Sequence, residues 1–308
     1  MLSQPEAVST TAPGQWRELL RSWLLRGIYR FGWQVAARLP GRLVALIISG
    51  ASWIALRNDG IHVRTLRRNL ALTTGAPVRD QLVQAALRSY LRNFYEVLAL
   101  PAWSVTEIRR RVSAVNEHVV RGAHAGPGVV VALPHSGNWD LAGAWACATG
   151  MPVTTVAEQL SDAEYAAFVA FRKGLGLKVV SHRDPGALTA LIDAIHCRRV
   201  VCLLADRDLS GTGVPVSWRG HSITMPAGPA MVARRTGAAL VPAVCQFTED
   251  GMAIIIGESI THRQGRDGLV AMMQEVADFF ADTIAWQPED WHMMQPFFSD
   301  RKPTQETR

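Results

Sequence analysis

Short apolar runs rich in β-branched residues, separated by stretches of helical periodicity, dominate the sequence from residue 128 onward. The runs are Gly128–Leu133, Leu177–Ser181, Val200–Leu204, Ala239–Phe247 and Met252–Gly257. Their continuous apolarity is typical of strands buried on both faces of a sheet. Helices are expected between them, near 138–149, 161–174, 185–197, 226–236 and 267–286. This alternation predicts an α/β fold with a largely parallel central sheet flanked by helices.

The 308 residues are predicted to form a single domain, because a hydrophobic content of 48% supports one large core and no central stretch has a linker composition. A further helix is expected over residues 78–100, ended by Pro101. The polar ends, 1–14 and 301–308, are expected to be disordered. No basic segment followed by an apolar run opens the chain, so a secretory signal is not expected.

The positive charge of the chain is concentrated at its N-terminal end. Residues 1–70 hold ten arginines against three acidic residues, a balance of +7, whereas the remainder is nearly neutral. Tryptophans accompany these arginines, and Leu43–Leu56 carries no charge but is shorter than the roughly 20 residues of a spanning helix. We therefore expect membrane-associating helices over about 15–57 that lie in, or re-enter, an anionic surface. The alternative is an ordinary helical pair packed on the core; no nucleic-acid-binding motif is present.

The loop after the first strong strand, PHSGNWD, contains a histidine and an aspartate that suit acyl transfer. His135 is a candidate general base that removes a proton from a hydroxyl, and Asp140 is its candidate partner, fixing the tautomer and stabilising the imidazolium. The two can meet only if His135 stays on the loop while Asp140 lies in the first helical turn. The spacing alone is close to chance, since His262 and Asp267 share it and are expected to form a surface pair.

The segment Asp206-Arg207-Asp208 follows another buried strand, so its side chains are expected at the same edge of the sheet. Either acid is a candidate to reach His135 in a charge relay or to bind sugar hydroxyls in the acceptor. The alternative is a helix cap with an Arg–Asp surface pair.

The four cysteines lack metal-site spacing and are predicted to be small buried residues in a reducing compartment. No metal site is expected.

The form H-S-G-N-W-D at 135–140 resembles the H-x4-D/E motif of the lysophospholipid and glycerolipid acyltransferase superfamily, in the version found in its lipid A late acyltransferase branch. Within that branch, three further segments most resemble phosphatidylinositol mannoside acyltransferases: ADRDLS at 205–210, MPAGP at 225–229 and PEDWH at 288–292. The resemblance extends from about Trp16 to Phe298. The glycerolipid branch carries a P-E-G-[ST]-R block where this chain has Asp206-Arg207-Asp208, which points away from a glycerol phosphate acceptor.

The resemblance implies a peripheral or monotopic enzyme at the cytoplasmic face of the plasma membrane. It implies transfer of palmitoyl from acyl-CoA, a substrate rather than a cofactor, to a mannose 6-hydroxyl of phosphatidylinositol mannoside. It also implies substrate-binding roles for Glu158 and Arg172, to which Arg207 is added as a candidate. The alternatives are a lipid A-type or lysophospholipid acyltransferase, with another acceptor or an acyl-carrier-protein donor, and a non-catalytic membrane adaptor. A serine hydrolase is disfavoured because no G-x-S-x-G elbow is present.

Overall fold

The computed structural model describes residues 38–158, 169–208 and 211–298. Its centre is a seven-stranded sheet in the order β1-β9-β8-β2-β5-β3-β4, in which only the β8–β9 pair is antiparallel. The strands are β1 (Val112–Val115), β2 (Val129–Leu133), β3 (Val153–Ala157), β4 (Lys178–Ser181), β5 (Val200–Leu204), β8 (Ala239–Phe247) and β9 (Met252–Ile256). The prediction of a largely parallel sheet flanked by helices is confirmed.

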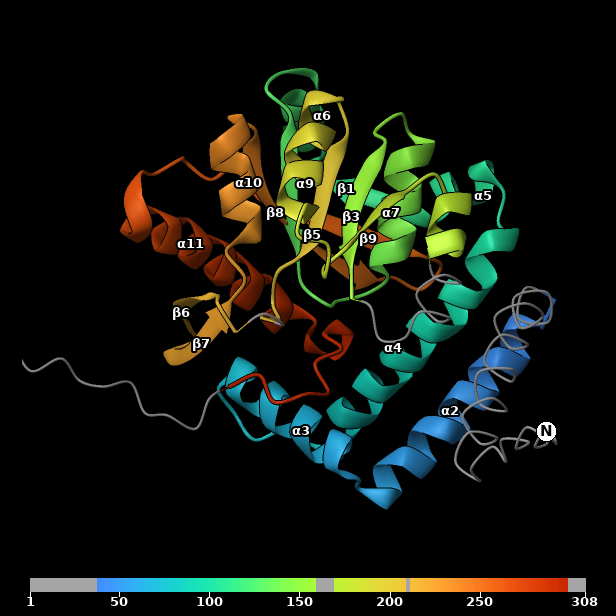
Figure 1. The fold of residues 1–308 in the computed structure, drawn as a ribbon. Helices are drawn as coiled ribbons and strands as arrows, with labels where there is room; N and C mark the ends of the chain where they lie inside the picture. The colour runs from blue at the N-terminus through green and yellow to red at the C-terminus, as the bar shows by residue number, and fades with distance from the viewer. Residues whose placement is uncertain (1–37, 159–168, 209–210, 299–308) are drawn as a thin grey trace, which may run out of the picture.

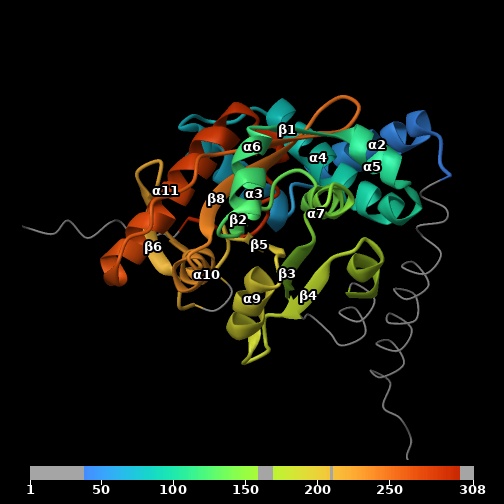
Figure 2. The ribbon, with the colours of Figure 1, turned by 90° about the horizontal axis from the view of Figure 1, so that it is seen from above.

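Two layers of helices cover the two faces of this sheet (Figure 2). One face packs against α9 (Ala187–His196), α10 (Gly228–Thr236) and α11 (Gly265–Trp286). The other packs against α5 (Val105–Arg111), α6 (Glu117–Ala125) and α7 (Trp139–Ala148). The strands alternate between the two cores: Val130 and Ala132 face α9 and α10, whereas Val129 and Val131 face α7. A parallel strand buried on both faces produces this arrangement.

A third group of helices lies below the sheet in Figure 1. It consists of α2 (Gly41–Asn58), α3 (Ile61–Thr74) and α4 (Asp80–Ala99), which share a small apolar core that includes Leu66, Leu70 and Leu87. The 3-10 turn η1 (Leu100–Ala102) follows α4. A second 3-10 turn, η2 (Pro288–Asp290), packs against α4. Through α4 and η2 this group reaches the loops at the carboxyl edge of the sheet.

The structure adds elements that the sequence did not predict. Strand β1 and helices α3, α5 and α6 were not expected, and neither was the antiparallel hairpin β6 (Val214–Trp218) and β7 (His221–Met225). The helices expected near 138–149, 185–197, 226–236 and 267–286 are present within a few residues. The helix expected at 161–174 is described only from residue 169 onward, and the disorder expected at 1–14 and 301–308 lies outside the described residues.

The uncharged stretch 43–56 forms most of α2, and much of it is exposed. Leu43, Leu46, Ile47, Trp53 and Ile54 are between 42% and 70% exposed. Their separations of three, four and seven residues place them on one side of the helix. Among the described residues, no helix is both long and apolar enough to span a bilayer.

Candidate active site

The candidate site is built where β2 and β5, neighbours in the middle of the sheet, both end. Leu133 on β2 pairs with Leu204 on β5, and the Ala205 amide continues the ladder by donating to the Leu133 carbonyl oxygen. His135 and Asp206 each follow two residues after this pair, so the parallel register brings them face to face. His135 Nδ1 lies 2.5 Å from Asp206 Oδ1, and the His135 amide donates to Asp206 Oδ2 at 2.9 Å.

The surroundings of Asp206 determine which ring nitrogen of His135 carries a proton. Asp206 is 1% exposed, and burial alone would raise the pKa of its carboxyl; the charge and hydrogen bonds of His135, with a hydrogen bond from Trp291, hold the pKa below its ordinary value. An ionised carboxylate only accepts hydrogen bonds, so His135 Nδ1 carries the proton and Nε2 has the free lone pair. The His135 side chain is 20% exposed, so the ring reaches the surface of the site.

The structure assigns Asp140 a different partner from the one predicted. Its carboxylate forms a buried, two-pronged ion pair with Arg172, whose Nε and terminal nitrogen lie 2.6 and 3.2 Å from the two carboxylate oxygens. Both side chains are at most 5% exposed. The acid that orients His135 is thus Asp206, as one of the two sequence interpretations allowed, and not Asp140. The reason is geometric: α7 begins at Trp139 and directs Asp140 toward the helical residues 169–174 that carry Arg172.

Each residue between His135 and Asp140 has a structural task. The Ser136 hydroxyl donates to the Cys245 carbonyl oxygen on β8 at 2.8 Å. Gly137 has a φ of +58° and passes so close to Cys245 that an added Cβ would lie 2.7 Å from its carbonyl oxygen, so only glycine fits. Asn138 caps α7, because its side-chain oxygen accepts from the Leu141 amide. The ring of Trp139 meets the His135 ring edge-on at 5.3 Å.

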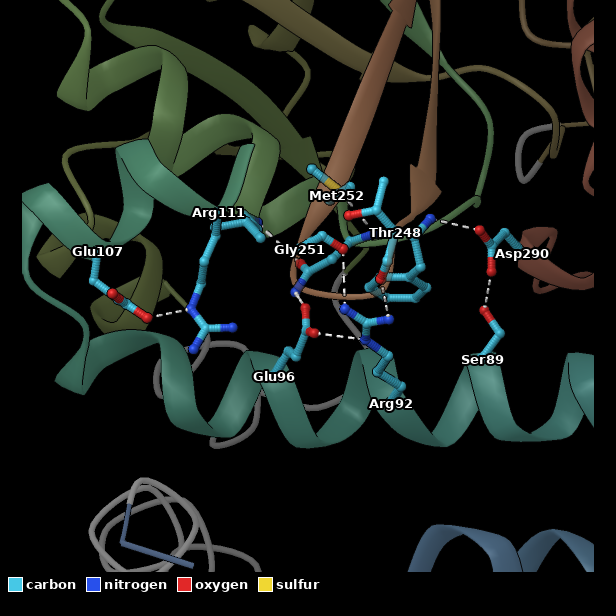
Figure 3. Close-up of polar contacts among 12 residues, drawn as sticks. Ser89, Arg92, Glu96, Glu107, Arg111, Thr248, Gly251, Met252 and Asp290 are labelled. Carbon is cyan, nitrogen blue, oxygen red and sulfur yellow. Dashed lines mark hydrogen bonds and ion pairs between the residues drawn. The ribbon is translucent and has the colours of Figure 1, made fainter. Parts of the chain in front are cut away.

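Helix α4 supports this loop from the carboxyl side of the sheet. The side-chain nitrogen of Asn138, Nδ2, donates to a carboxylate oxygen of Glu96, which is buried and also paired with Arg92. Arg92 in turn donates to the carbonyl oxygens of Thr248 and Gly251, in the turn between β8 and β9 (Figure 3). The N-cap of α7, and with it the end of the loop that carries His135, is therefore held by a helix about 40 residues earlier in the chain.

The segment after η2 closes the site from the C-terminal end. The indole of Trp291, fully buried and stacked on Trp218, donates to Asp206 Oδ2 at 3.0 Å. The His292 amide donates to the His135 carbonyl oxygen, and the Gly137 amide donates to the Asp290 carbonyl oxygen. In the sequence, PEDWH at 288–292 contributes only to the family resemblance. A direct bond from Trp291 to the acid of the site was not foreseen, because no local pattern links residues 85 positions apart.

His292 is buried beside His135, with one ring nitrogen 3.0 Å from the Ser89 hydroxyl and Nδ1 without a hydrogen-bond partner among the described residues. Ser89 also donates to Asp290, one of the contacts in Figure 3. Burial lowers the pKa of His292 to about 3, and His135 contributes in the same direction. Burial raises the pKa of Asp290 to about 6. At neutral pH, His292 is therefore an uncharged side chain packed next to the His135–Asp206 pair.

The depressed pKa of His292 predicts a loss of stability in acid. Below the ordinary value of 6.5 the unfolded chain binds a proton that the folded chain does not, so the free energy of unfolding falls as the pH falls. Relative to His292→Phe, the native chain should lose about 2 kcal/mol between pH 7.5 and pH 5. Asp290 acts in the opposite direction over part of this range, but it is present in both proteins. Urea unfolding at the two pH values measures the difference, and parallel stability curves would contradict the prediction.

The remaining candidate residues lie around the site in varied settings. Asp208 accepts hydrogen bonds from the amides of Gly211 and Gly213, so one of its tasks is to close the turn before β6. Arg207 is partly exposed beside it, and Glu158 is exposed at the end of β3.

His262 bonds to the Ala238 carbonyl oxygen, so the predicted surface pair with Asp267 is wrong. Among the described residues no group of three or more His, Cys, Asp or Glu is placed to hold a metal ion.

A narrow, partly open apolar cavity extends from the site between α7 and the sheet. Trp139, Asp140 and Arg172 line it near His135. Aliphatic side chains from five strands and α7 form almost all of the rest of its wall, as follows: Val131, Leu133, Ala142, Ala146, Val153, Val200, Leu204, Ala243, Ile254 and Ile256. The site therefore combines a carboxylate-oriented imidazole with a slot shaped for a hydrocarbon chain.

A carboxylate-paired histidine beside an apolar slot at the carboxyl edge of an α/β sheet is the arrangement expected of an acyltransferase, and comparison with known proteins identifies that class. The model of the bacterial lipid A biosynthesis acyltransferase family matches residues 14–300, so the chain belongs to that family. It is 38% identical over 277 residues to the phosphatidylinositol mannoside acyltransferase of Mycolicibacterium smegmatis, covering 87% of this chain and 89% of the relative. It is 39% identical over 278 residues to the protein of that name from Mycobacterium tuberculosis H37Rv, covering 87% of this chain and 86% of the relative.

Proposed function

We propose that the chain transfers a long acyl group, palmitoyl in the first instance, from acyl-CoA to the mannose 6-hydroxyl of phosphatidylinositol mannoside. The observation that carries the chemistry is the 2.5 Å contact between His135 Nδ1 and Asp206, beside an apolar cavity. The names of the relatives from both mycobacterial species support the glycolipid acceptor. No further cofactor takes part in the proposed reaction, because the thioester is itself an activated acyl donor.

In this reaction His135 Nε2 removes the proton of the acceptor hydroxyl as its oxygen attacks the thioester carbonyl carbon. Asp206 stabilises the imidazolium that forms and keeps Nδ1 protonated throughout. The tetrahedral intermediate then collapses: the carbon–sulfur bond breaks, the imidazolium returns its proton to the sulfur, and free CoA leaves. An ester on the sugar remains, and no acyl-enzyme forms, because the acceptor supplies the nucleophile.

The cavity accounts for the acyl half of the reaction. Its wall is almost wholly apolar, and Trp139, which contacts the His135 ring, lies at its end nearest the site. A fatty chain that enters there loses its contact with water, at about 0.8 kcal/mol for each buried CH₂ group, and places the thioester carbonyl beside His135. Arg172 lines the same end, where its guanidinium is paired with the Asp140 carboxylate.

An acyl-transfer assay with defined acceptors tests the proposal. The purified chain, radiolabelled palmitoyl-CoA and vesicles containing phosphatidylinositol mannoside should yield a labelled product esterified at a mannose 6-oxygen, located by NMR. Parallel reactions would contain a lysophospholipid or a lipid A precursor as acceptor, or palmitoyl-acyl carrier protein as donor. Faster transfer to either alternative acceptor, or from the carrier protein, would overturn the proposed substrates. Vesicle binding without turnover of any thioester would instead identify a membrane adaptor.

The proposed acceptor is a membrane lipid, and we place the enzyme at the cytoplasmic face of the plasma membrane. The exposed side of α2 supports membrane docking: Leu46, Ile47, Trp53 and Ile54 form an apolar face that water does not favour. Arg42 and Arg57 are exposed near its two ends, and the Arg57 guanidinium lies over the Trp53 ring at 5.1 Å. Arginine beside tryptophan is typical of the headgroup region of an anionic bilayer.

Charged substitutions on this face should weaken binding to vesicles. The double variant Leu46→Glu and Trp53→Glu is expected to lower the partition coefficient onto anionic vesicles by more than about tenfold, because two apolar groups are lost and two negative charges are added. Sedimentation with sucrose-loaded vesicles measures it. Trp286→Glu, at the end of α11 and 89% exposed, is the matched control and should bind as the native chain does. Equal loss in both variants would count against docking through α2.

A further inference from the structure

We infer that Trp291 is a positioning residue of the acyl-transfer site, whose indole N–H fixes the Asp206 carboxylate opposite His135 and favours the unprotonated, reactive form of the imidazole. This assignment rests on the proposed function, in which His135 is the base. The Trp291 side chain is 0% exposed, so it acts through Asp206 and not by contact with a substrate. Three features carry the assignment: the donors around the carboxylate, the backbone contacts of residue 291, and the groups that hold its ring.

The Asp206 carboxylate accepts hydrogen bonds from two separate segments of the chain. Oδ1 faces His135 Nδ1 at 2.5 Å, whereas Oδ2 accepts from the His135 amide at 2.9 Å and from Trp291 Nε1 at 3.0 Å. The side chain of Asp206 has no exposed surface, so these donors take the place of water. With two donors on Oδ2, rotation of the carboxylate would break hydrogen bonds, and Oδ1 therefore stays directed at the ring.

Backbone contacts place Trp291 beside the loop that carries His135. The Gly137 amide donates to the Asp290 carbonyl oxygen at 2.9 Å, and the His292 amide donates to the His135 carbonyl oxygen at 2.8 Å. These two hydrogen bonds join the loop to the residues on either side of Trp291. The indole is therefore attached to the same loop whose imidazole partner it orients, although the two segments are more than 150 residues apart in the chain.

Aromatic neighbours hold the ring of Trp291 itself. It stacks on Trp218, with ring centroids 5.5 Å apart and planes 16° apart, and meets Phe297 edge-on at 4.8 Å. Trp218 is also 0% exposed, but its Nε1 has no hydrogen-bond partner among the described residues. The two stacked indoles thus share one packing environment and differ in what their N–H groups meet. This difference separates the packing role of Trp291 from its role as a donor.

The indole N–H also affects how readily His135 holds a proton on Nε2. While the imidazole is protonated, its positive charge compensates the Asp206 carboxylate. When the ring loses the Nε2 proton, the carboxylate charge is uncompensated, and each hydrogen bond that it accepts becomes stronger. The donor on Trp291 therefore stabilises the state with a free Nε2 lone pair, which is the form that removes a proton from the acceptor hydroxyl.

The other charged and titratable groups around the site stay the same when either tryptophan is replaced. They are Asp290 and His292 from η2 and the segment after it, Asp140 on α7 with its partner Arg172, and Arg207 and Asp208 after β5. A change in the titration of His135 that appears in a Trp291 variant and is absent from the matched Trp218 variant therefore reports the lost hydrogen bond to Asp206.

The experiment compares Trp291→Phe with Trp218→Phe by NMR titration of the histidine rings in the whole chain, without substrate. The His135 signal is the one that disappears in His135→Ala. In Trp291→Phe its midpoint should move to higher pH by roughly half a unit to one unit, because the unprotonated state loses a hydrogen bond. In Trp218→Phe, which removes similar packing and no bond to Asp206, the midpoint should stay at its native value.

Acyl transfer gives a second measurement on the same variants. In Trp291→Phe the acid limb of the kcat/KM profile should move to higher pH with the midpoint, and kcat above that limb should fall about tenfold because the carboxylate is less firmly held. Trp218→Phe should keep the native acid limb. A loss of kcat in Trp291→Phe with an unmoved limb would indicate a purely structural role and would contradict the inference.

Replacement of Trp291 by 3-benzothienylalanine keeps the shape of the indole and substitutes sulfur for the N–H group, so it serves if Trp291→Phe fails to fold. It should reproduce the shift of the midpoint. A native midpoint in the folded Trp291 variants, or an equal shift in Trp218→Phe, would overturn the inference. Absence of acyl transfer by the native chain from every donor would instead overturn the proposed function, and the NMR titration, which needs no substrate, keeps the two outcomes apart.

Discussion

Replacing His135 by alanine should lower kcat for acyl transfer about 10³-fold while leaving the melting temperature close to that of the native chain. The size follows from the loss of a positioned general base, which contributes about 10²- to 10⁴-fold. The small effect on stability follows from position: the ring is partly exposed at the rim of the site, and its loss leaves the Asp206 hydrogen bonds from the His135 amide and from Trp291 in place. Thiol release from palmitoyl-CoA in the presence of acceptor measures the rate.

His262→Ala is the control for this experiment, because His262 stands at the same spacing from Asp267 as His135 does from Asp140. Its ring bonds to the Ala238 carbonyl oxygen, at the opposite end of β8 from Cys245, so its removal should leave kcat unchanged. Full activity in His135→Ala would exclude the proposed mechanism. Equal losses in the two histidine variants would show that the effect is structural rather than catalytic.

Asp206→Asn should mainly lower kcat, whereas Asp140→Asn should mainly lower the free energy of unfolding. In Asp206→Asn, the oxygen that accepts from the His135 amide and from Trp291 can remain, but an amide nitrogen would face Nδ1. The imidazole then changes tautomer, Nε2 carries the proton, and kcat should fall at least about 10²-fold. Stability should change by only about 1 kcal/mol, because the backbone and indole hydrogen bonds persist. A combined measurement of kcat and urea unfolding separates the two quantities.

Asp140→Asn removes the negative charge opposite Arg172, whose side chain is 5% exposed. Breaking a buried ion pair by neutralising one partner costs roughly 3 kcal/mol in the free energy of unfolding, so this variant should be destabilised far more than Asp206→Asn. Where it remains folded, its rate should exceed that of Asp206→Asn. The pairing of Asp140 with His135 suggested by the sequence predicts the reverse order of rates, and that order would show that the contact of His135 with Asp206 is not the catalytic one.

The strands of the main sheet were predictable because each is a continuous apolar run, as burial on both faces demands. The hairpin β6–β7 was not, because its residues alternate between buried and exposed, with Val214, Val216 and Trp218 inward, and one of the intervening residues is Pro215. Its turn is formed by Arg219 and Gly220, both at positive φ, and the arginine in the first of these positions is not a typical hairpin-turn residue. Strand β1 is short and pairs at the edge of the sheet, where the composition is less constrained.

The features of the site also fall into two groups, those that local sequence determines and those that tertiary structure determines. The sequence by itself determined the histidine, the strand end that it follows and the H-S-G-N-W-D loop, because these depend on local chain geometry: a glycine at positive φ, an asparagine cap and a helix that starts at Trp139. Only the tertiary structure decided which acid holds the imidazole. Asp140 is five residues from His135 but points to Arg172, whereas Asp206 is 71 residues away and meets the ring because β2 and β5 are parallel neighbours in register. Sheet register is a long-range property, and no local spacing encodes it.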